Sequence, residues 1–415
     1  MTSTSHWQAE LTAAAGALPI ERLTGSSDTD VAIIGAGITG IAAALWLARA
    51  GVRVVVLEGR TVAAGASGRN GGFLLSGTAE SYSAAVARFG RKRARRIWEF
   101  SVRNHEIARE LVGELSARGW ETGYRQLGSL RIAASEAELD EIQASLPLMA
   151  EDHLRVERVT REELPACLRS AYFGGVRYPT DGEIQPARFV TGIASLAARA
   201  GARIYQESPV VGLTAIDDGW RVRTSDGNVQ ANRLLLATNA WLPALGEHLG
   251  ADWLAQAITP TRGQMLVTAP APDRLFECPC YADDGYQYWR QLADGRLAVG
   301  GWRNRSFATE ATTDETAHDE VQTHLDAFVR VTLGLTDLPI EQRWAGIMAF
   351  SADGLPLVGH VPGVRECYIA GGYTGHGNAY ALHATQVVAA LMLGSDHPAA
   401  DLFEPGRFAE SADPR

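Results

Sequence analysis

The sequence predicts an α/β fold, because it alternates short β-branched strands with apolar helices. Residues 30–58 give a β-branched run, a glycine turn, an apolar helix and a second β-branched run. Buried strands joined through a helix are typical of a parallel sheet. Residues 367–393 repeat the order of strand, glycine turn and helix. Residues 260–268 and 285–301 predict additional antiparallel strands, and the second of these segments folds back at a turn at 293–295.

The first glycine turn has a spacing that suits a nucleotide. Gly35, Gly37 and Gly40 give the pattern G-x-G-x-x-G, which allows a tight turn, a pyrophosphate against the backbone, and close packing of the helix on the strand. Glu58 ends the second strand, where an acid can accept hydrogen bonds from ribose hydroxyls and would repel a 2′-phosphate. The pattern predicts a bound dinucleotide, NAD or FAD, although a βαβ unit without a ligand has the same elements.

Length and charge narrow the class of protein. A chain of 415 residues is long enough for two domains. The net charge of −10 argues against nucleic-acid and anionic-lipid partners. The start of the chain lacks the basic and apolar regions of a signal peptide, and the apolar run at 379–393 is too short to span a membrane. We therefore expect a cytoplasmic protein.

The four cysteines are scattered, and Cys278 and Cys280 match no zinc pattern. We expect free thiols and no metal site. Residues 1–27 are polar and turn-rich, so they predict an arm over the domain or a loose terminus, in which His6 and Trp7 could be an anchor. The arginine-rich stretch within 81–118 is followed by acids at helical spacing, which indicates a solvated helix face.

Two further stretches point to the ligand. Residues 59–72 contain five glycines, as expected of a loop beside a bound cofactor, or of a flexible surface loop. The turn at 371–378 begins a second helix, whose N–H groups at 374–377 can face an anion. A reduced flavin carries such charge at its N1–C2=O edge, whereas NAD needs no second site, so FAD is favoured.

Candidate substrate-binding residues fall in three places. Tyr286, Tyr288 and Arg290 alternate along a predicted strand, which indicates a pocket wall or a half-buried sheet face. His376 lies in the glycine turn at a helix start, where a core role is less common. The candidates for active-site residues are His376, Tyr288, Arg290, Arg69 and Arg303. An arginine among them could hold a substrate carboxylate bidentately.

Together these segments resemble the FAD-dependent D-amino-acid oxidase superfamily. The resemblance covers residues 30–394. Its motifs are DVAIIGAGITG at 30–40, LLLATNAW at 234–241, TRGQ at 261–264, DGRLAVGG at 294–301, DGLPLVG at 353–359 and GGYTGHG at 371–377. Within the superfamily, ASGRNGG at 66–72 and the pair His6–Trp7 are most similar to the gamma-glutamylputrescine oxidoreductase branch.

The resemblance implies a Rossmann-like FAD-binding domain of the glutathione-reductase type, interleaved with a substrate domain that has a mixed, largely antiparallel sheet. The FAD domain would comprise 28–80, 165–245 and 340–400, and the substrate domain 81–164 and 246–339. The expected cofactor-binding residues are Gly35, Gly37, Ile38, Thr39, Gly40, Glu58, Gly59, Arg60, Ser67, Gly68, Asn70, Gly71, Gly72, Val210, Ala237, Thr238, Asn239, Trp241, Gly346, Gly372, Thr374, Gly375 and Gly377.

The implied reaction is oxidation of the C–N bond of a small amine or amino acid, for example one like gamma-glutamylputrescine. Hydride would pass to flavin N5, and the imine would hydrolyse to an aldehyde or keto acid. Oxygen would be the acceptor, giving H₂O₂. The alternatives are a dehydrogenase that passes electrons to a quinone or carrier, a module acting on modified tRNA, and a flavoprotein sensor.

Two positions depart from the family pattern. Relatives with covalent flavin have a cysteine where this chain has Gly346, so noncovalent FAD is expected. Sarcosine-oxidase-like relatives have a lysine near N5, at a position near Ala298 here, and the only lysine of this chain is Lys92. Either another cation, such as His376 or an arginine, assists the reaction with oxygen, or oxygen is not the acceptor.

Overall fold

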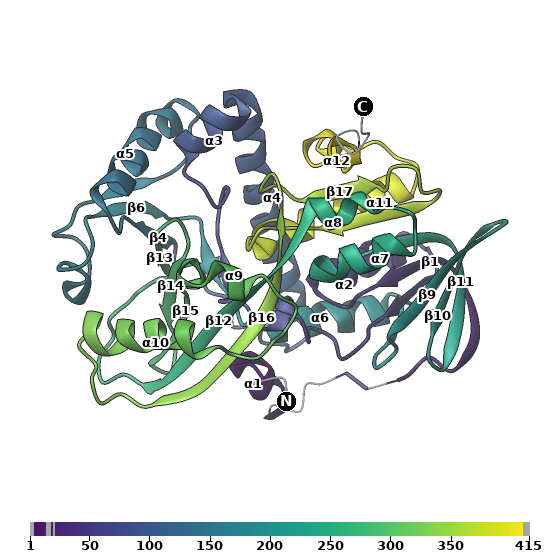
Figure 1. Cartoon of the computed structure of the whole chain (residues 1–415), viewed down its shortest axis with the longest axis horizontal. Helices are drawn as coiled ribbons and strands as arrows, with labels where there is room; N and C mark the ends of the chain where they lie inside the picture. Colours follow the sequence, from purple (N-terminus) through teal and green to yellow (C-terminus); the bar gives the residue numbers. More distant parts are fainter. Residues whose placement is uncertain (1–3, 14–17, 20, 410–415) are drawn as a thin grey trace.

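The computed structural model describes residues 4–13, 18–19 and 21–409. Two eight-stranded sheets form the two halves of the molecule (Figure 1). Each sheet combines strands that are far apart in the sequence, so neither half is one continuous segment. The chain contains α-helices and both parallel and antiparallel strands, as predicted.

The first sheet lies in the right half of Figure 1 and is mainly parallel. Its strands run in the order β17 (Leu357–His360), β18 (Cys367–Gly371), β11 (Gly227–Leu236), β1 (Gly25–Ile34), β2 (Val54–Leu57) and β8 (Arg203–Tyr205), and β10 (Gly219–Thr224) and β9 (Val210–Ile216) extend from β11. From β18 to β8 every neighbouring pair is parallel, and β17 is antiparallel to β18. The strand–turn–helix–strand predicted at 30–58 is the centre of this sheet.

The second sheet lies in the left half and is antiparallel except for one pair. Its order is β16 (Ile340–Ser351), β12 (Ile258–Pro270), β15 (Arg296–Gly301), β14 (Gln287–Gln291), β13 (Cys280–Ala282), β4 (Ser129–Ile132), β6 (Gly175–Tyr178) and β5 (Glu157–Val159). The parallel pair is β13 with β4. A separate two-stranded sheet pairs β3 (Phe73–Leu74) with β7 (Gly182–Glu183).

Helices cover both sheets. The α-helices are α1 (His6–Ala13), α2 (Ile38–Arg49), α3 (Tyr82–Phe89), α4 (Arg91–Ser116), α5 (Glu136–Glu151), α6 (Pro186–Arg199), α7 (Leu242–Glu247), α8 (Trp253–Ala257), α9 (Phe307–Glu310), α10 (Asp319–Ala327), α11 (Gly377–Met392) and α12 (Gly406–Ala409). The short 3₁₀ helices are η1 (Ala66–Gly68), η2 (Ala166–Leu168), η3 (Asn239–Trp241), η4 (Arg303–Arg305) and η6 (Ala400–Leu402), and η5 (Phe328–Thr332) is a π-helix. None of the described helices is long and apolar enough to cross a membrane.

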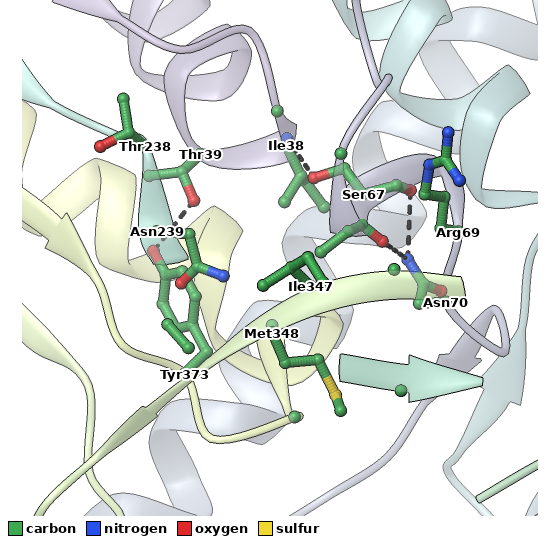
Figure 2. Close-up of a pocket in the computed structure, with 18 of the residues that line it drawn as sticks. Ile38, Thr39, Ser67, Arg69, Asn70, Thr238, Asn239, Ile347, Met348 and Tyr373 are labelled. Carbon is green, nitrogen blue, oxygen red and sulfur yellow. Dashed lines mark hydrogen bonds between the residues drawn. The ribbon is translucent and has the colours of Figure 1, made fainter. Parts of the chain in front are cut away.

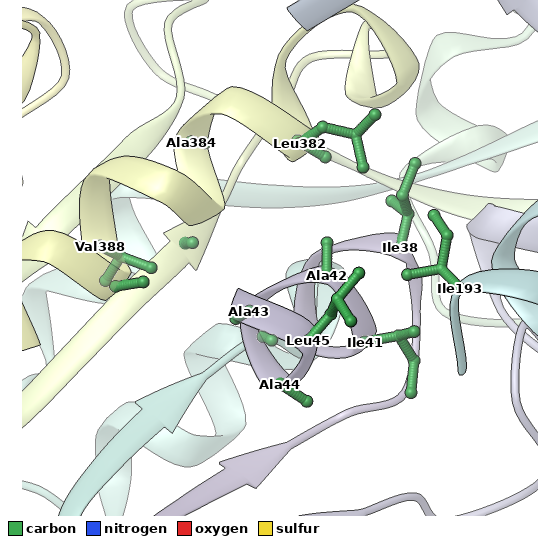
Figure 3. Packing of buried hydrophobic residues seen from close by; sticks show 14 of the residues in the cluster. Ile38, Ile41, Ala42, Ala43, Ala44, Leu45, Ile193, Leu382, Ala384 and Val388 are labelled. Atoms are coloured by element: carbon green, nitrogen blue, oxygen red, sulfur yellow. The ribbon is translucent and has the colours of Figure 1, made fainter. Parts of the chain in front are cut away.

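The main core lies where α2 meets α6 and α11 on one face of the first sheet. Ile41 and Leu45 of α2 pack with Ile193 of α6 and with Leu382 and Val388 of α11 (Figure 3). All five side chains are fully buried, and burying a side chain of this size contributes about 1.5–3 kcal/mol. The core therefore fixes the start of α2 relative to the start of α11, the two glycine turns singled out from the sequence.

Several element boundaries differ from the predictions. The helical stretch at 81–118 is broken at Gly90, whose φ is +77°, into α3 and α4. The helix predicted at 314–333 begins only at Asp319. Strand β6 pairs with β4 and β5, and β16 pairs with β12, so both belong to the second sheet, although their residues fall in segments expected for the FAD domain. The chain therefore passes from the second sheet to the first within the segments 165–245 and 340–400.

Candidate functional site

A cavity of about 890 Å³ lies between the two sheets, at the upper end of the range for pockets that hold small molecules. One end is formed where β1, β2 and β11 finish, at the carboxyl edge where open α/β sheets bind ligands. The other end is formed by β12, β14, β16 and the turn before α11. Figure 2 shows the residues that line it, drawn from both halves of the molecule.

The first glycine turn has no room for side chains. Gly35 has φ +102°, and a Cβ there would lie 2.8 Å from the carbonyl oxygen of Ala237. A Cβ at Gly40 would lie 1.9 Å from the carbonyl oxygen of Gly35. At the start of α2 the N–H of Ile38 donates to Ser67 Oγ at 2.9 Å (Figure 2). The bare backbone and helix N-terminus make a cradle for an anionic group.

Two polar side chains line the end of the cavity near α2. Glu58 has hydrogen-bond partners, and the hydroxyl of Thr238 has none among the described residues. The Glu58 carboxylate accepts hydrogen bonds from the N–H groups of Ala36 and Arg60, both at 2.8 Å. The buried hydroxyl of Thr238 lines the cavity and has no hydrogen-bond partner within the described part of the chain. A buried hydroxyl without a partner is unfavourable, so it indicates that a ligand supplies one. These features fit a dinucleotide.

The glycine-rich loop after Glu58 forms one wall. Asn70 donates from Nδ2 to the carbonyls of Ala66 and Ser67 at 3.0 and 3.1 Å (Figure 2). Arg69 donates from Nη1 to the carbonyl of Ala345 in β16 at 2.9 Å, and burial lowers its pKa. The loop is therefore an ordered structure with internal hydrogen bonds.

The loop after α9 contacts this wall through the carboxylate of Glu315. Glu315 lies 2.6 Å from Arg60 and 3.6 Å from Arg69, and one of its carboxylate oxygens is buried without a hydrogen-bond partner among the described residues. Sequence reasoning missed Glu315 because it lies in an irregular stretch that carries no motif.

The second glycine turn meets the first. Tyr373 Oη lies 3.0 Å from Thr39 Oγ1, which joins the start of α11 to the start of α2 (Figure 2). Thr374 has φ +50°, and its N–H donates to the carbonyl of Ala349 at 2.8 Å. His376 precedes α11 and lines the cavity. Burial lowers the pKa of its imidazole, so His376 is neutral at pH 7.

Aromatic rings and one arginine form the opposite end. The guanidinium of Arg303 lies 4.4 Å from the ring centre of Tyr286 and 4.2 Å from that of Phe350. Such cation–π contacts stabilise a partly desolvated cation. Arg303 forms no salt bridge with a carboxylate of the described residues. Tyr288 is also on this wall, and burial raises its pKa to about 12, so it stays neutral.

Most of the predicted residues line this cavity. Of the active-site candidates, His376, Tyr288, Arg69 and Arg303 do so. The predicted cofactor residues that line it are Gly35, Gly37, Ile38, Thr39, Glu58, Gly59, Arg60, Ser67, Asn70, Gly71, Val210, Ala237, Thr238, Asn239, Trp241, Gly346, Thr374, Gly375 and Gly377.

The predicted residues that do not line the cavity are Gly40, Gly68, Gly72, Gly372 and Arg290. The four glycines are packing positions, since a Cβ at each would lie within 2.7 Å of another atom. Arg290 differs from the prediction because it is turned away from the cavity. Its guanidinium lies 4.6 Å from the ring centre of Trp7 and donates to the carbonyl of Ile184 at 3.0 Å.

Two lining residues could have been found from the sequence. Met348 and Phe350 follow Gly346 at intervals of two along β16, the period at which a strand presents one face. The described residues contain no group of three or more His, Cys, Asp or Glu side chains that could hold a metal ion.

Comparison with known proteins agrees with this arrangement. Residues 30–391 match the family described as "DAO: FAD dependent oxidoreductase". The chain is 28% identical over 388 residues to the probable oxidoreductase OrdL of Haemophilus influenzae, covering 90% of this chain and 85% of that protein. It is also 28% identical to gamma-glutamylputrescine oxidoreductase of Escherichia coli, covering 91% and 86%.

The fold has solved relatives too. The crystal structure of glycine oxidase from Geobacillus kaustophilus superposes with a TM-score of 0.79 at 23% identity, covering 91% of this chain and 98% of that one. The cradle at α2, the unpartnered Thr238 hydroxyl and the second turn at α11 all suit FAD, the family's cofactor. The chain therefore belongs to the DAO family of FAD-dependent oxidoreductases.

Proposed function

We propose that this protein oxidises the C–N bond of a small amine that also carries a carboxylate, with FAD bound noncovalently. The observation that carries the proposal is Arg303, a half-buried cation held between two aromatic rings on the cavity wall without an acidic partner in the described chain. An arginine fork recognises a carboxylate bidentately. Relatives named for glycine and for gamma-glutamylputrescine have substrates of this class.

Each end of the cavity has a part in the reaction. When bound, FAD supplies a two-electron acceptor for the hydrogen on the carbon next to nitrogen. Arg303 would hold the carboxylate, and Tyr286, Tyr288 and Phe350 would exclude water and orient the amine. The neutral imidazole of His376 can accept a proton from an ammonium substrate, which must be deprotonated before oxidation. Loss of hydride and a proton gives an imine, and water converts it to a carbonyl compound and an amine.

Noncovalent attachment is supported at Gly346. A Cβ on Gly346 would lie 2.8 Å from Cβ of Arg69, so a cysteine has no space there unless Arg69 moves. None of the four cysteines lines the cavity. Denaturation with acid or heat should therefore release all of the flavin into the supernatant.

We propose oxygen as the electron acceptor, and one observation favours a dehydrogenase instead. Ala298 occupies the position near which some relatives have a lysine, and its side chain is fully buried among apolar residues. Lys92 is exposed near the start of α4 and does not line the cavity. Arg60, Arg69 and Arg303 line the cavity, and Glu315 lies beside the first two, so Arg303 is the cation that we propose to assist oxygen in place of lysine.

The test is an anaerobic series of matched amines, followed by flavin absorbance. Each carboxylate-bearing amine is paired with one that lacks the carboxylate, as gamma-glutamylputrescine with putrescine, and sarcosine with dimethylamine; glycine and D-amino acids complete the series. We expect only carboxylate-bearing members to bleach the flavin at micromolar to millimolar concentration. Bleaching by the partners alone contradicts the role of Arg303, and no bleaching at all contradicts amine oxidation.

Air is then admitted to the bleached enzyme. Recovery of the flavin absorbance with one H₂O₂ per flavin supports an oxidase. Absence of recovery, combined with rapid recovery on adding a quinone, supports the dehydrogenase.

A further inference from the structure

The helix at the start of the described chain is built into the molecule. Helix α1 lies below the centre of Figure 1, near α6 and β16. Ser5 is fully buried and Trp7 is only 1% exposed. Within the predicted arm at 1–27, the part around Trp7 is thus packed against the protein, and residues 1–3, 14–17 and 20 lie outside the described residues.

Three side chains of this segment donate hydrogen bonds to one loop. Ser5 Oγ donates to the carbonyl of Gly68 at 2.5 Å, and Trp7 Nε1 donates to the carbonyl of Asn70 at 2.7 Å. Gln8 Nε2 donates to the carbonyls of Ala63 and Ala64 at 3.1 and 3.2 Å. These acceptors lie in an irregular stretch, whose carbonyls are not satisfied by strand pairing.

The same loop forms the cofactor wall. Gly65, Ser67, Asn70 and Gly71 line the cavity. Ser67 Oγ also accepts the hydrogen bond from Ile38 at the start of α2, as described above. A displacement of the loop would therefore move both the wall and the group that caps the phosphate-facing helix.

The other face of α1 is fixed to the rest of the protein. Arg290 stacks on Trp7, and Gln185 Nε2 donates to the carbonyl of Trp7 at 2.8 Å. Trp344 of β16 contacts Trp7 edge to face, with ring centres 6.3 Å apart, and donates from Nε1 to the carbonyl of Arg69 at 2.9 Å. The loop is thus held from two sides by two tryptophans that contact each other.

We propose that α1 is a positioning element for FAD. Its side chains donate hydrogen bonds to the backbone of 63–70 and so keep this loop in the conformation that accepts the cofactor. Trp7 carries most of this effect, because it combines a hydrogen bond to the loop with burial against Arg290 and Trp344. The inference concerns cofactor binding alone and does not depend on which substrate is oxidised.

The test compares two substitutions of the same kind. Trp7→Phe removes the indole N–H that reaches the loop. Trp220→Phe is the matched control: Trp220 of β10 is 5% exposed and donates from Nε1 to the carbonyl of Arg365 at 3.1 Å, and neither residue lines the cavity. Flavin is removed from each protein, FAD is titrated by fluorescence quenching, and thermal unfolding of each apoprotein is followed by circular dichroism.

We expect Trp7→Phe to raise the dissociation constant for FAD at least about tenfold, since the partly buried carbonyl of Asn70 loses its donor. Trp220→Phe should lower the melting temperature of the apoprotein by about as much as Trp7→Phe does, but it should leave the dissociation constant for FAD unchanged. Equal dissociation constants for the two variants, with equal melting temperatures, would overturn the proposal and leave α1 with a purely structural role.

A milder variant protects the test against failure to fold. Ser5→Ala removes only the hydroxyl that donates to Gly68, and we expect the dissociation constant to rise about threefold to tenfold. Hydrogen exchange of the apoprotein gives a second readout. Faster exchange confined to 63–72 in both Trp7→Phe and Ser5→Ala supports the proposal, and unchanged exchange there contradicts it.

Discussion

The two ends of the cavity are built from different parts of the protein. The end at α2 depends on bare backbone, with Gly35 and Gly40 packed so closely that a Cβ has no space. The end at β14 and β16 depends on side chains, above all the guanidinium of Arg303 between two rings. Adding atoms should therefore damage the first end, and removing atoms should damage the second. The cofactor site and the substrate site can be tested separately for this reason.

The largest effect is expected at Gly40. Gly40→Ala places a Cβ 1.9 Å from the carbonyl oxygen of Gly35 and 3.2 Å from Ile33, so α2 must move away from β1. We expect loss of bound flavin and a decrease in the free energy of unfolding of about 3 kcal/mol or more, measured by flavin content and by chemical denaturation.

A glycine elsewhere provides the control. Gly113 lies exposed in α4, and a Cβ there would meet nothing within 4 Å. Gly113→Ala should stabilise the protein by about 0.4–1 kcal/mol, because alanine is the better helix former. If Gly40→Ala kept its flavin and its stability, the packing account of the first turn would be wrong.

The same difference explains what could be predicted from the sequence. The motif at Gly35 to Gly40 and the acid at Glu58 lie within one strand–helix–strand unit, so their spacing alone indicated how they meet. The second turn at His376 could be predicted in the same way. In both cases the proposed binding depends on backbone geometry, which glycine patterns record directly.

Side chains at the other end left weaker signals. Tyr288 and Arg290 alternate along β14 and so share a face, but only Tyr288 lines the cavity. Arg290 instead stacks on the ring of Trp7. The two residues are 283 positions apart, so no local pattern shows this contact. Glu315 gave no signal at all, because its role depends on how its loop reaches Arg60 and Arg69.

A smaller effect, confined to the substrate, is expected at Arg303. Arg303→Leu removes the fork that would bind a carboxylate, which should lower kcat/KM for a carboxylate-bearing amine about 10- to 100-fold. The dissociation constant for FAD should stay unchanged, because the substitution leaves the glycine turns that we propose to hold the cofactor unaltered. Arg305→Leu, at an exposed position two residues away, should alter neither quantity.

Steady-state kinetics on amines with and without a carboxylate, together with flavin titration, measure both quantities. Equal losses of kcat/KM for the two classes of amine would contradict carboxylate recognition. A weakened affinity of Arg303→Leu for FAD would contradict the separation of the two ends.

Outside the cavity, the half of the molecule that contains the second sheet also depends on contacts between side chains. Asp181 is fully buried and accepts hydrogen bonds from Ser76 Oγ and Ser129 Oγ, both at 2.6 Å. It thereby joins the segment after β3 to the second sheet. Burial raises the pKa of its carboxyl to about 7, whereas the carboxyl in an unfolded chain has a pKa of about 3.9.

The last expected effect is a pH dependence of stability at this position. Between pH 4 and pH 7 the folded protein keeps a proton on Asp181 that the unfolded chain has lost, so its contribution to stability decreases as pH rises, by at most about 1.4 kcal/mol per pH unit. Asp181→Asn cannot titrate. The difference in unfolding free energy between the natural protein and this variant should therefore change across that range and level off above pH 7. Because His105 and His383, whose pKa values burial lowers to about 4, are present in both proteins, their opposite pH dependence cancels in the difference. A difference that stays constant from pH 4.5 to pH 8 would mean that Asp181 is ionised in the folded protein, held by its serine donors as a buried anion.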